Sequence, residues 1–185
     1  MATIRPTIFS QVIHMKYLEH RRHTERTRPY DHINQNGIDL AKRVAGETGP
    51  FHYTLTSSIP RAVETALVLG YEVNRTDDLL FHYKPELMGE LGKQTFQDIA
   101  KAIELSKYTD SYSQDQIALL KETMDEIKEG ETVLVVSHGS MVEIGLVSMF
   151  PDMDHDEWGN PFTYLEGYRV GYENGEFKNP EILRA

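Results

Sequence analysis

The chain has 185 residues, a length that fits one domain spanning 1–185, and it carries a formal net charge of −10 and no cysteine. The missing cysteines exclude disulfides, thiolate nucleophiles and cysteine-ligated zinc, and the acidic balance disfavours nucleic acid and anionic membranes as partners, because their binding depends on Lys and Arg. No apolar run approaches the ~20 residues of a membrane span, and residues 1–6 lack a signal-peptide core, so we expect a cytoplasmic protein.

In the first half of the chain, strands alternate with helices. The pattern predicts strands over 13–20 and 52–56, a helix that ends near residue 45, and a helix over 58–69. In the earlier helix Ile38, Ala41 and Ala45 share one face. In the later one, Pro60 suits a first turn and Gly70 marks the end.

The second half repeats this alternation and then changes to strands. After a stretch of mostly loop over 74–94, with a short strand over 79–81, the pattern predicts helices over 96–106, 113–129 and 140–149 and strands over 132–137, 162–173 and 176–178. The strand 132–137 is apolar enough to be buried on both faces, which is typical of a parallel sheet. The pair Asn174-Gly175 predicts a hairpin. We therefore expect an α/β fold with a mostly parallel sheet.

Three short segments with polar and basic side chains follow predicted strands directly. They are residues 22–25, 57–66 and 135–140. Because ligands bind at the carboxyl ends of the strands in an open α/β sheet, we expect these segments to meet in one crevice. This crevice would bring together two arginines and two histidines, which are Arg22, His23, Arg61 and His138.

These four side chains suit the transfer of a phosphoryl group. Arginine binds phosphate through a planar fork, and a helix N-terminus supplies further N–H donors. Histidine can act as a nucleophile that forms a covalent intermediate. Two arginines would repel a metal ion, so the pattern predicts neither a metal nor another cofactor. Each of these residues alone could equally have a structural role, and the arginines over 21–28 could simply form a solvated basic loop. Only the combination of all four residues points specifically to phosphoryl transfer.

The combination resembles the histidine phosphatase superfamily, the phosphoglycerate mutase-like proteins. The family's initial Arg-His-Gly is similar to residues 22–24, its Ser-Ser-x-x-Arg-Ala-x-Glu-Thr-Ala segment to 57–66, and its Ser-His-Gly to 137–139. The resemblance implies a three-layer α/β/α fold and a phosphohistidine on the first histidine of the motifs. It also implies a phosphate pocket formed by both arginines and the second histidine, with an acidic proton donor from a mid-chain loop.

The sequence departs from the family pattern near the first histidine. Thr24 replaces the usual glycine, and His20 permits a shifted alignment. Only His23 is preceded by arginine and followed by a Thr-Glu pair, so we assign the nucleophile to His23. The mutases of the family usually carry an asparagine where this chain has residues 26–28, which favours a phosphatase over a mutase.

Two glutamates qualify as the proton donor that the resemblance implies. Glu86 is followed by an apolar residue and two spaced glycines, whereas Glu90 has one glycine after it, so we favour Glu86 and keep Glu90 as the alternative. Glu25 and Glu143 are the next candidates, because each lies close in sequence to a motif histidine.

The sequence thus predicts a phosphomonoesterase that acts on a small phosphorylated substrate or a phosphoprotein. His23 would attack phosphorus, Arg22, Arg61 and His138 would hold the phosphoryl oxygens, and Glu86 would protonate the leaving group. The alternatives are a mutase and a non-catalytic phosphate-binding module. Specificity would come from loops over 26–32, 81–96 and 150–161, the last of which is either a lid that contains Trp158 or a plain surface loop.

Overall fold

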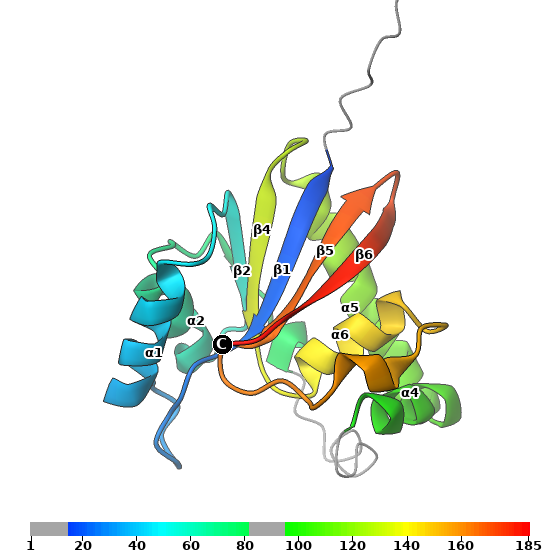
Figure 1. The fold of residues 1–185 in the computed structure, drawn as a ribbon, viewed down its shortest axis with the longest axis horizontal. Helices are drawn as coiled ribbons and strands as arrows, with labels where there is room; N and C mark the ends of the chain where they lie inside the picture. Colours follow the sequence, from blue (N-terminus) through cyan, green and yellow to red (C-terminus); the bar gives the residue numbers. More distant parts are fainter. Residues whose placement is uncertain (1–14, 82–94) are drawn as a thin grey trace, which may run out of the picture.

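The computed structural model describes residues 15–81 and 95–185, and its centre is a mixed sheet (Figure 1). The strands have the order β3-β2-β4-β1-β5-β6. The parallel strands are β1 (Lys16–Arg22), β2 (Tyr53–Thr56), β3 (Arg75–Thr76) and β4 (Thr132–Ser137). The antiparallel strands at one edge are β5 (Gly167–Glu173) and β6 (Glu176–Leu183). The carboxyl ends of β1, β2 and β4 therefore meet at one edge of the sheet.

Helices cover both faces of this sheet, which gives three layers (Figure 1). On one face lie α1 (Gln35–Ala45) and α2 (Pro60–Val68), and on the other lie α4 (Phe96–Leu105), α5 (Lys107–Asp125) and α6 (Met141–Met149). Two short 3-10 helices complete the described elements, η1 (Asp78–Phe81) and η2 (His155–Trp158). The predicted α/β fold with a mostly parallel sheet is confirmed.

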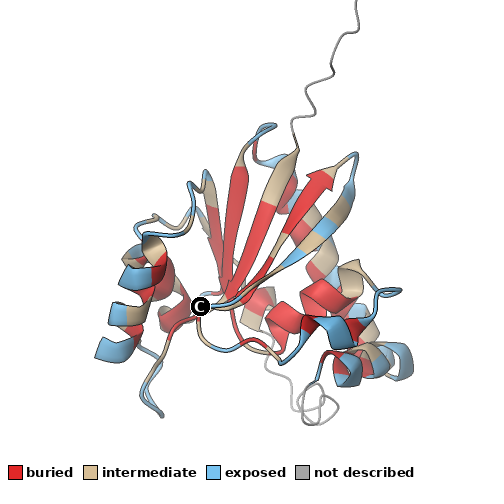
Figure 2. Cartoon of the chain, in the orientation of Figure 1, coloured by how far each residue is buried: buried red, intermediate tan, exposed pale blue. Residues whose placement is uncertain are grey.

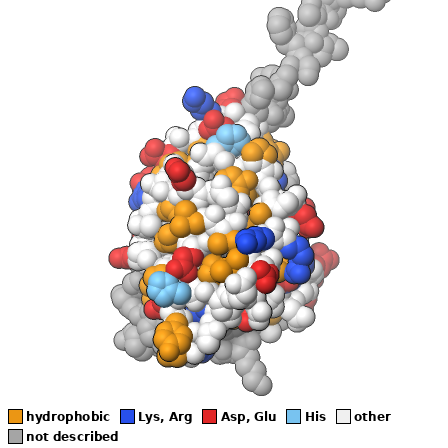
Figure 3. Space-filling model, turned by 90° about the vertical axis from the view of Figure 1, so that its left-hand side faces the viewer, with side chains coloured by type: hydrophobic (Ala, Val, Ile, Leu, Met, Phe, Trp, Pro, Cys, Tyr) orange, Lys and Arg blue, Asp and Glu red, His pale blue; other side chains and the backbone are white. Residues whose placement is uncertain are grey.

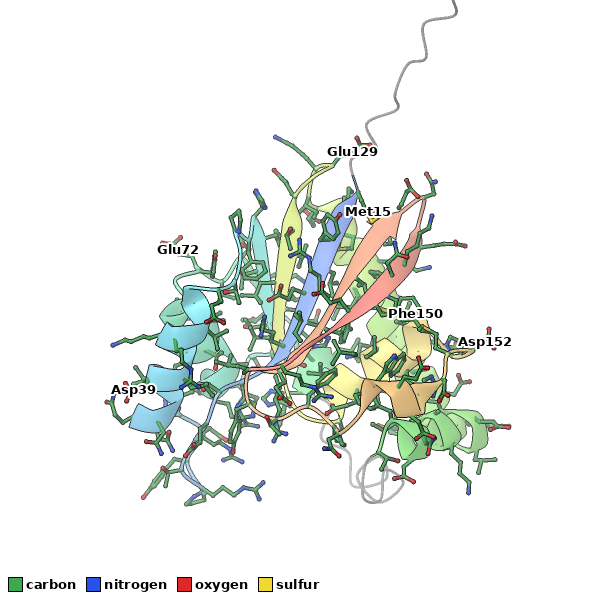
Figure 4. All side chains as sticks on the ribbon, in the orientation of Figure 1. Met15, Asp39, Glu72, Glu129, Phe150 and Asp152 are labelled. Atoms are coloured by element: carbon green, nitrogen blue, oxygen red, sulfur yellow. The ribbon has the colours of Figure 1, made fainter. Side chains whose placement is uncertain are left out.

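The helices bury two hydrophobic cores against the sheet. The larger core lies under α4, α5 and α6, and the smaller one lies under α1 and α2 (Figure 2). All six residues of β4 are buried, as the apolar run predicted. Side chains from both faces of the sheet fill the spaces beneath the helices, whereas Asp39 points outward from α1 (Figure 4).

Strand β1 is unusually polar, and the structure satisfies its polar groups inside the protein. On one face Glu19 and Arg21 form a buried ion pair at 2.5 Å, and Arg21 also donates to the carbonyl of Leu165 at 2.5 Å. On the other face His20 is fully buried, with its ring nitrogens 2.6 Å from Ser137 Oγ and 3.1 Å from Tyr168 Oη. Buried charges are tolerated when they are paired in this way.

Several predicted elements differ from the observed ones: β1 lies two to three residues later than predicted, α5 ends at Asp125 rather than 129, and β6 continues to Leu183 rather than 178. Helix α5 begins at Lys107 rather than at 113, since Ser106 caps it by accepting an N–H from Thr109. The short strand over 79–81 is instead the helix η1, and β3 lies a few residues earlier. The hairpin is confirmed: Asn174 and Gly175 have φ values of 54° and 80° between β5 and β6.

Strand β5 begins at Gly167, five residues later than the predicted start at 162. Leu165 adopts a left-handed φ of 60°, and its N–H donates to the carbonyl of Arg22 at 3.1 Å. This backbone contact ties the segment before β5 to the end of β1. A segment that alternates like a strand is therefore a structured loop beside the candidate site.

Residues 150–161 fit the surface-loop interpretation better than the lid, because most of their side chains are exposed although Trp158 itself is buried. Trp158 is buried in the larger core, with its ring centroid 5.4 Å from that of Phe96. Phe150 and Asp152, at the start of this loop, lie at the outer end of α6, on the side of the molecule away from α1 (Figure 4).

The surface of the molecule mixes side chains of all kinds. Figure 3 shows acidic, basic and apolar side chains interspersed over the face that lies on the left in Figure 1. None of the helices described is both long enough and apolar enough to span a membrane.

Candidate active site

The candidate site lies at the carboxyl ends of β1, β2 and β4, where the three motif segments meet. Two backbone hydrogen bonds continue the sheet past its last paired residues: His23 N–H donates to Ser137 O at 2.8 Å, and Ser57 N–H donates to Val136 O at 3.2 Å. The structure therefore brings together His23, Arg61 and His138, residues that are far apart in the sequence.

The ring of His23 is held in one tautomer. Its Nδ1 lies 2.6 Å from the carbonyl oxygen of Thr24, which only accepts, so Nδ1 carries the hydrogen. The opposite nitrogen, Nε2, then carries the lone pair of the ring, which accepts the Nε–H of Arg61 at 3.1 Å. Nε2 is the atom that a nucleophilic histidine would use, and here it faces an arginine.

Burial, with a smaller contribution from the positive charges of Arg61, Arg22 and Arg26, lowers the pKa of His23 to about 3, against the opposing effect of the hydrogen bond to Thr24. The side chain is 5% exposed. At neutral pH the imidazole is therefore uncharged, which is the form that can attack an electrophile.

His138 lies beside His23, with the two ring centroids 5.0 Å apart. Its Nε2 is 2.7 Å from Ser57 Oγ, which itself accepts the N–H of Ile59 at 3.4 Å. We assign the Ser57 hydrogen to this Nε2, which leaves the ring hydrogen on Nδ1. That Nδ1 is buried and has no hydrogen-bond partner among the described residues, so it is available to donate to a ligand. Burial lowers the pKa of His138 to about 2.

Arg22 presents a second unused donor. Its Nη1 donates to the carbonyl of Phe162 at 2.8 Å, but its buried Nε has no partner within the described part of the chain. The guanidinium lies over the ring of Tyr164 (5.1 Å) and against Gly139. A Cβ at Gly139 would lie 3.1 Å from Cζ of Arg22, so this glycine allows the close approach.

Arg61 lies in the first turn of α2, after Pro60, and is 5% exposed. Besides its bond to His23, it donates from Nη1 to Asp31 Oδ1 at 2.6 Å. Sequence reasoning missed Asp31, although it falls in the loop 26–32 that we associated with specificity. Glu64 anchors this loop by accepting the N–H of Ile33 at 2.9 Å.

Two aromatic rings that sequence reasoning also missed stand beside the histidines. The ring of Phe81 lies 4.7 Å from that of His138, and the ring of Tyr164 lies 5.9 Å from that of His23. Phe81 follows β3 and Tyr164 precedes β5 in a loop, so their places depend on tertiary packing. These apolar walls limit the water around the polar groups, which strengthens electrostatic interactions there.

Backbone strain occurs beside both histidine-bearing segments. Ser140, two residues after His138, has a φ of 69° and a ψ of −43°, and Leu165 has a φ of 60°. Ser140 precedes α6, whose first N–H groups and partial positive charge add to the site's affinity for an anion. Strain of this kind costs about 1–3 kcal/mol per residue and is concentrated at functional sites.

The structure separates His20 from the site residues, because His20 is a buried structural residue of β1. Thr24 is accommodated in place of glycine: its N–H donates to Thr65 Oγ1 at 3.1 Å and its hydroxyl donates to Gly37 O at 2.9 Å.

The structure describes two of the four glutamates that are candidates for the proton donor. Glu86 and Glu90 both lie outside the described residues. Glu25 accepts a hydrogen bond from the side-chain amide of Asn34 at 3.0 Å. Glu143 is buried, and one of its carboxylate oxygens accepts the N–H of Phe162. Within 15–81 and 95–185, no three His, Asp or Glu side chains are grouped so that they could hold a metal ion.

The fold is shared with proteins of known structure. The chain has the fold of the phosphoglycerate mutase-like histidine phosphatases, which confirms, at the level of the fold, the resemblance that the motifs indicated. No family model and no curated protein sequence matches the chain.

Three solved structures illustrate this likeness of fold. A phosphoglycerate mutase from Bacillus anthracis is 16% identical with a TM-score of 0.65, over 91% of this chain and 92% of its own. A phosphoserine phosphatase from Entamoeba histolytica, in complex with 3-phosphoglyceric acid, is 16% identical with a TM-score of 0.65, over 92% and 98% of the two chains. A mycobacterial glucosyl-3-phosphoglycerate phosphatase is 15% identical with a TM-score of 0.58, over 91% and 97%.

The geometry around Arg61 leads to a first prediction. In Arg61→Lys the charge is kept, but a single ammonium group does not reproduce the planar fork that binds phosphate. We expect turnover of 4-nitrophenyl phosphate to fall by about 10²-fold, in the range found when one donor to a transition state is removed. Thermal unfolding should change less than turnover, because lysine keeps the positive charge that faces Asp31.

Arg75→Lys is the matched control. Like Arg61, Arg75 forms ion pairs, here with Asp77 at 2.9 Å and Glu122 at 2.7 Å, but it lies in β3 at the edge of the sheet. Its replacement should leave turnover unchanged. Equal turnover in Arg61→Lys and the unmodified protein would mean that Arg61 has no part in the chemistry.

Proposed function

We propose that this protein is a phosphatase that hydrolyses a phosphomonoester through a phosphohistidine intermediate. The observation that carries the proposal is the pairing of a neutral His23, whose Nε2 carries the lone pair and accepts a hydrogen bond from Arg61 at 3.1 Å, with buried donors that have no partner among the described residues, Arg22 Nε and His138 Nδ1. A nucleophile beside unused, preorganised donors is what transfer of an anionic group requires.

In the first step, His23 Nε2 attacks phosphorus and the bond from phosphorus to the leaving oxygen breaks. Arg22, Arg61 and His138 neutralise the charge on the phosphoryl oxygens. Glu86, which we propose as the acid, gives its proton to the leaving alkoxide. These roles match the motif positions of the family that the sequence resembles.

In the second step, water attacks the phosphohistidine. The Glu86 carboxylate takes a proton from the water, the bond between Nε2 and phosphorus breaks, and inorganic phosphate leaves. His23 then returns to its neutral form with the hydrogen on Nδ1, where the carbonyl of Thr24 holds it.

A mutase is the second candidate function, because one structural neighbour is a phosphoglycerate mutase. It would use the same phosphohistidine but return the phosphoryl group to a substrate rather than to water. The arginines at 26 and 28, in the region where the mutases usually carry an asparagine, favour the phosphatase.

The test is a panel of phosphorylated metabolites and phosphopeptides, assayed for release of inorganic phosphate at several pH values. The panel should include 3-phosphoglycerate and phosphoserine, which are the ligands in two solved structures of the phosphoserine phosphatase from Entamoeba histolytica. We expect phosphate release that survives exhaustive treatment with EDTA, since arginines supply the positive charge. Exchange of phosphate between positions of a phosphoglycerate, without release, would identify a mutase, and activity that requires an added metal would contradict the phosphohistidine mechanism.

A further inference from the structure

A buried carboxylate that the proposed mechanism does not use lies directly behind the site. Glu143 is in the first turn of α6, is 2% exposed, and accepts the N–H of Phe162 on Oε1 at 2.9 Å. Its Oε2 has no hydrogen-bond partner among the described residues. Burial raises the pKa of Glu143, although backbone N–H groups and Arg22 oppose that shift. Burying a carboxylate costs free energy, so we expect Glu143 to have a role at this position.

The backbone of Phe162 forms hydrogen bonds with both Glu143 and Arg22. The N–H of Phe162 is bound by Glu143, and its carbonyl accepts Nη1 of Arg22 at 2.8 Å. The side chain of Phe162 is 1% exposed and packs with its ring centroid 5.2 Å from that of Phe96. The backbone of Phe162 is thus a fixed link between a helix end and the guanidinium of Arg22.

We propose that Glu143 is a positioning residue for Arg22: through the backbone of Phe162 it sets the place of the guanidinium that binds the phosphoryl group. This inference rests on the proposed function, since it gives Arg22 a phosphate to bind. Within the described residues, the guanidinium of Arg22 also contacts the ring of Tyr164, at 5.1 Å, and the surface of Gly139. Misplacement of a catalytic group by ~1 Å can cost about 10²-fold in rate.

This role needs a hydrogen-bond acceptor at position 143, and it needs neither a proton nor a charge. Glutamine has the same shape, and its carbonyl oxygen can accept the N–H of Phe162. Alanine has no acceptor and leaves that N–H buried and unpaired. The pair of variants therefore separates a positioning role from the proton-donor role that the sequence position of Glu143 suggested.

The experiment compares Glu143→Gln and Glu143→Ala with the unmodified protein in two assays: hydrolysis of 4-nitrophenyl phosphate, and binding of inorganic phosphate by calorimetry, which needs no turnover. We expect Glu143→Gln to stay within about threefold of the unmodified protein in both. We expect Glu143→Ala to bind phosphate about tenfold more weakly and to lose about 10²-fold in kcat/KM.

A double-mutant cycle with Arg22→Ala shows whether the effect passes through Arg22. We expect Glu143→Ala to weaken phosphate binding in the unmodified protein and to add little in the Arg22→Ala background, because residues that act as a unit are not additive. Gln116→Ala is the matched control. Gln116 is also fully buried and donates to α6 at Met141 O at 2.9 Å, so its loss should lower the unfolding temperature and leave phosphate affinity unchanged.

Three results would overturn the inference. Additive effects of Glu143→Ala and Arg22→Ala would show that Glu143 acts independently of Arg22. An equal loss of turnover in Glu143→Gln and Glu143→Ala would show that the carboxyl is needed for its charge or proton. Phosphate binding by Glu143→Ala equal to that of the unmodified protein would also contradict it. The proposed function fails separately, if the unmodified protein neither releases phosphate from a substrate nor binds it.

Discussion

Replacement of His23 with alanine is expected to abolish the phosphoenzyme and to reduce turnover by about 10⁴-fold or more, as happens when a covalent nucleophile is removed. The physical reason is specific to this side chain. Its Nδ1–H is fixed on the carbonyl of Thr24, so Nε2 offers the lone pair, and burial keeps the ring neutral by lowering its pKa to about 3. Among the motif residues that the structure describes, His23 is the one whose ring nitrogen accepts from Arg61.

The measurement is rapid quenching after mixing with an aryl phosphate, followed by analysis of the phosphate bound to protein. Phosphohistidine is labile to acid and stable to alkali, so the label should have these properties and should be absent from His23→Ala. His20→Ala is the control: it removes a buried ring bound to Ser137 and Tyr168, so it should lower stability and keep the label. A label that persists in His23→Ala and disappears in His20→Ala would transfer the nucleophile to position 20.

Glu86→Gln is expected to slow hydrolysis of alkyl phosphates by about 10²–10⁴-fold, the usual contribution of a general acid. Hydrolysis of 4-nitrophenyl phosphate should slow far less in the first step, because nitrophenolate leaves without a proton. The second step should also slow, since the same carboxylate would activate water, and phosphoenzyme should accumulate. Single-turnover kinetics with the two kinds of substrate measure these steps separately.

Glu90→Gln is the matched variant, in the same loop and with the same change of charge. If the loss of rate depends on the leaving group in Glu90→Gln but not in Glu86→Gln, Glu90 is the general acid. Its absence from both would place the donor elsewhere. Of the remaining carboxylates, Asp31 is the one that touches Arg61, and it is 55% exposed, so Asp31→Asn would be tested next.

The order of elements could be predicted from the sequence because each is dominated by local signals. The apolar run of β4, the hairpin residues between β5 and β6, and the first turn of α2 at Pro60 depend on neighbours in the chain. The start of α5 depended on a single cap, Ser106, in a polar stretch without periodicity, and the sequence offered no strong sign of it. Boundaries that depend on one hydrogen bond are the least visible from sequence.

The sequence by itself determined the α/β fold and the residues that could form a phosphate site, because spacing and residue type reflect local backbone preferences and the chemistry of single side chains. Only the tertiary structure decided how those side chains are partnered. It placed His20 in the interior and His23 beside Arg61, and it buried Glu143 against the backbone of Phe162. Such pairings join segments that are far apart in the chain, and they depend on strand register and packing, which no local pattern encodes.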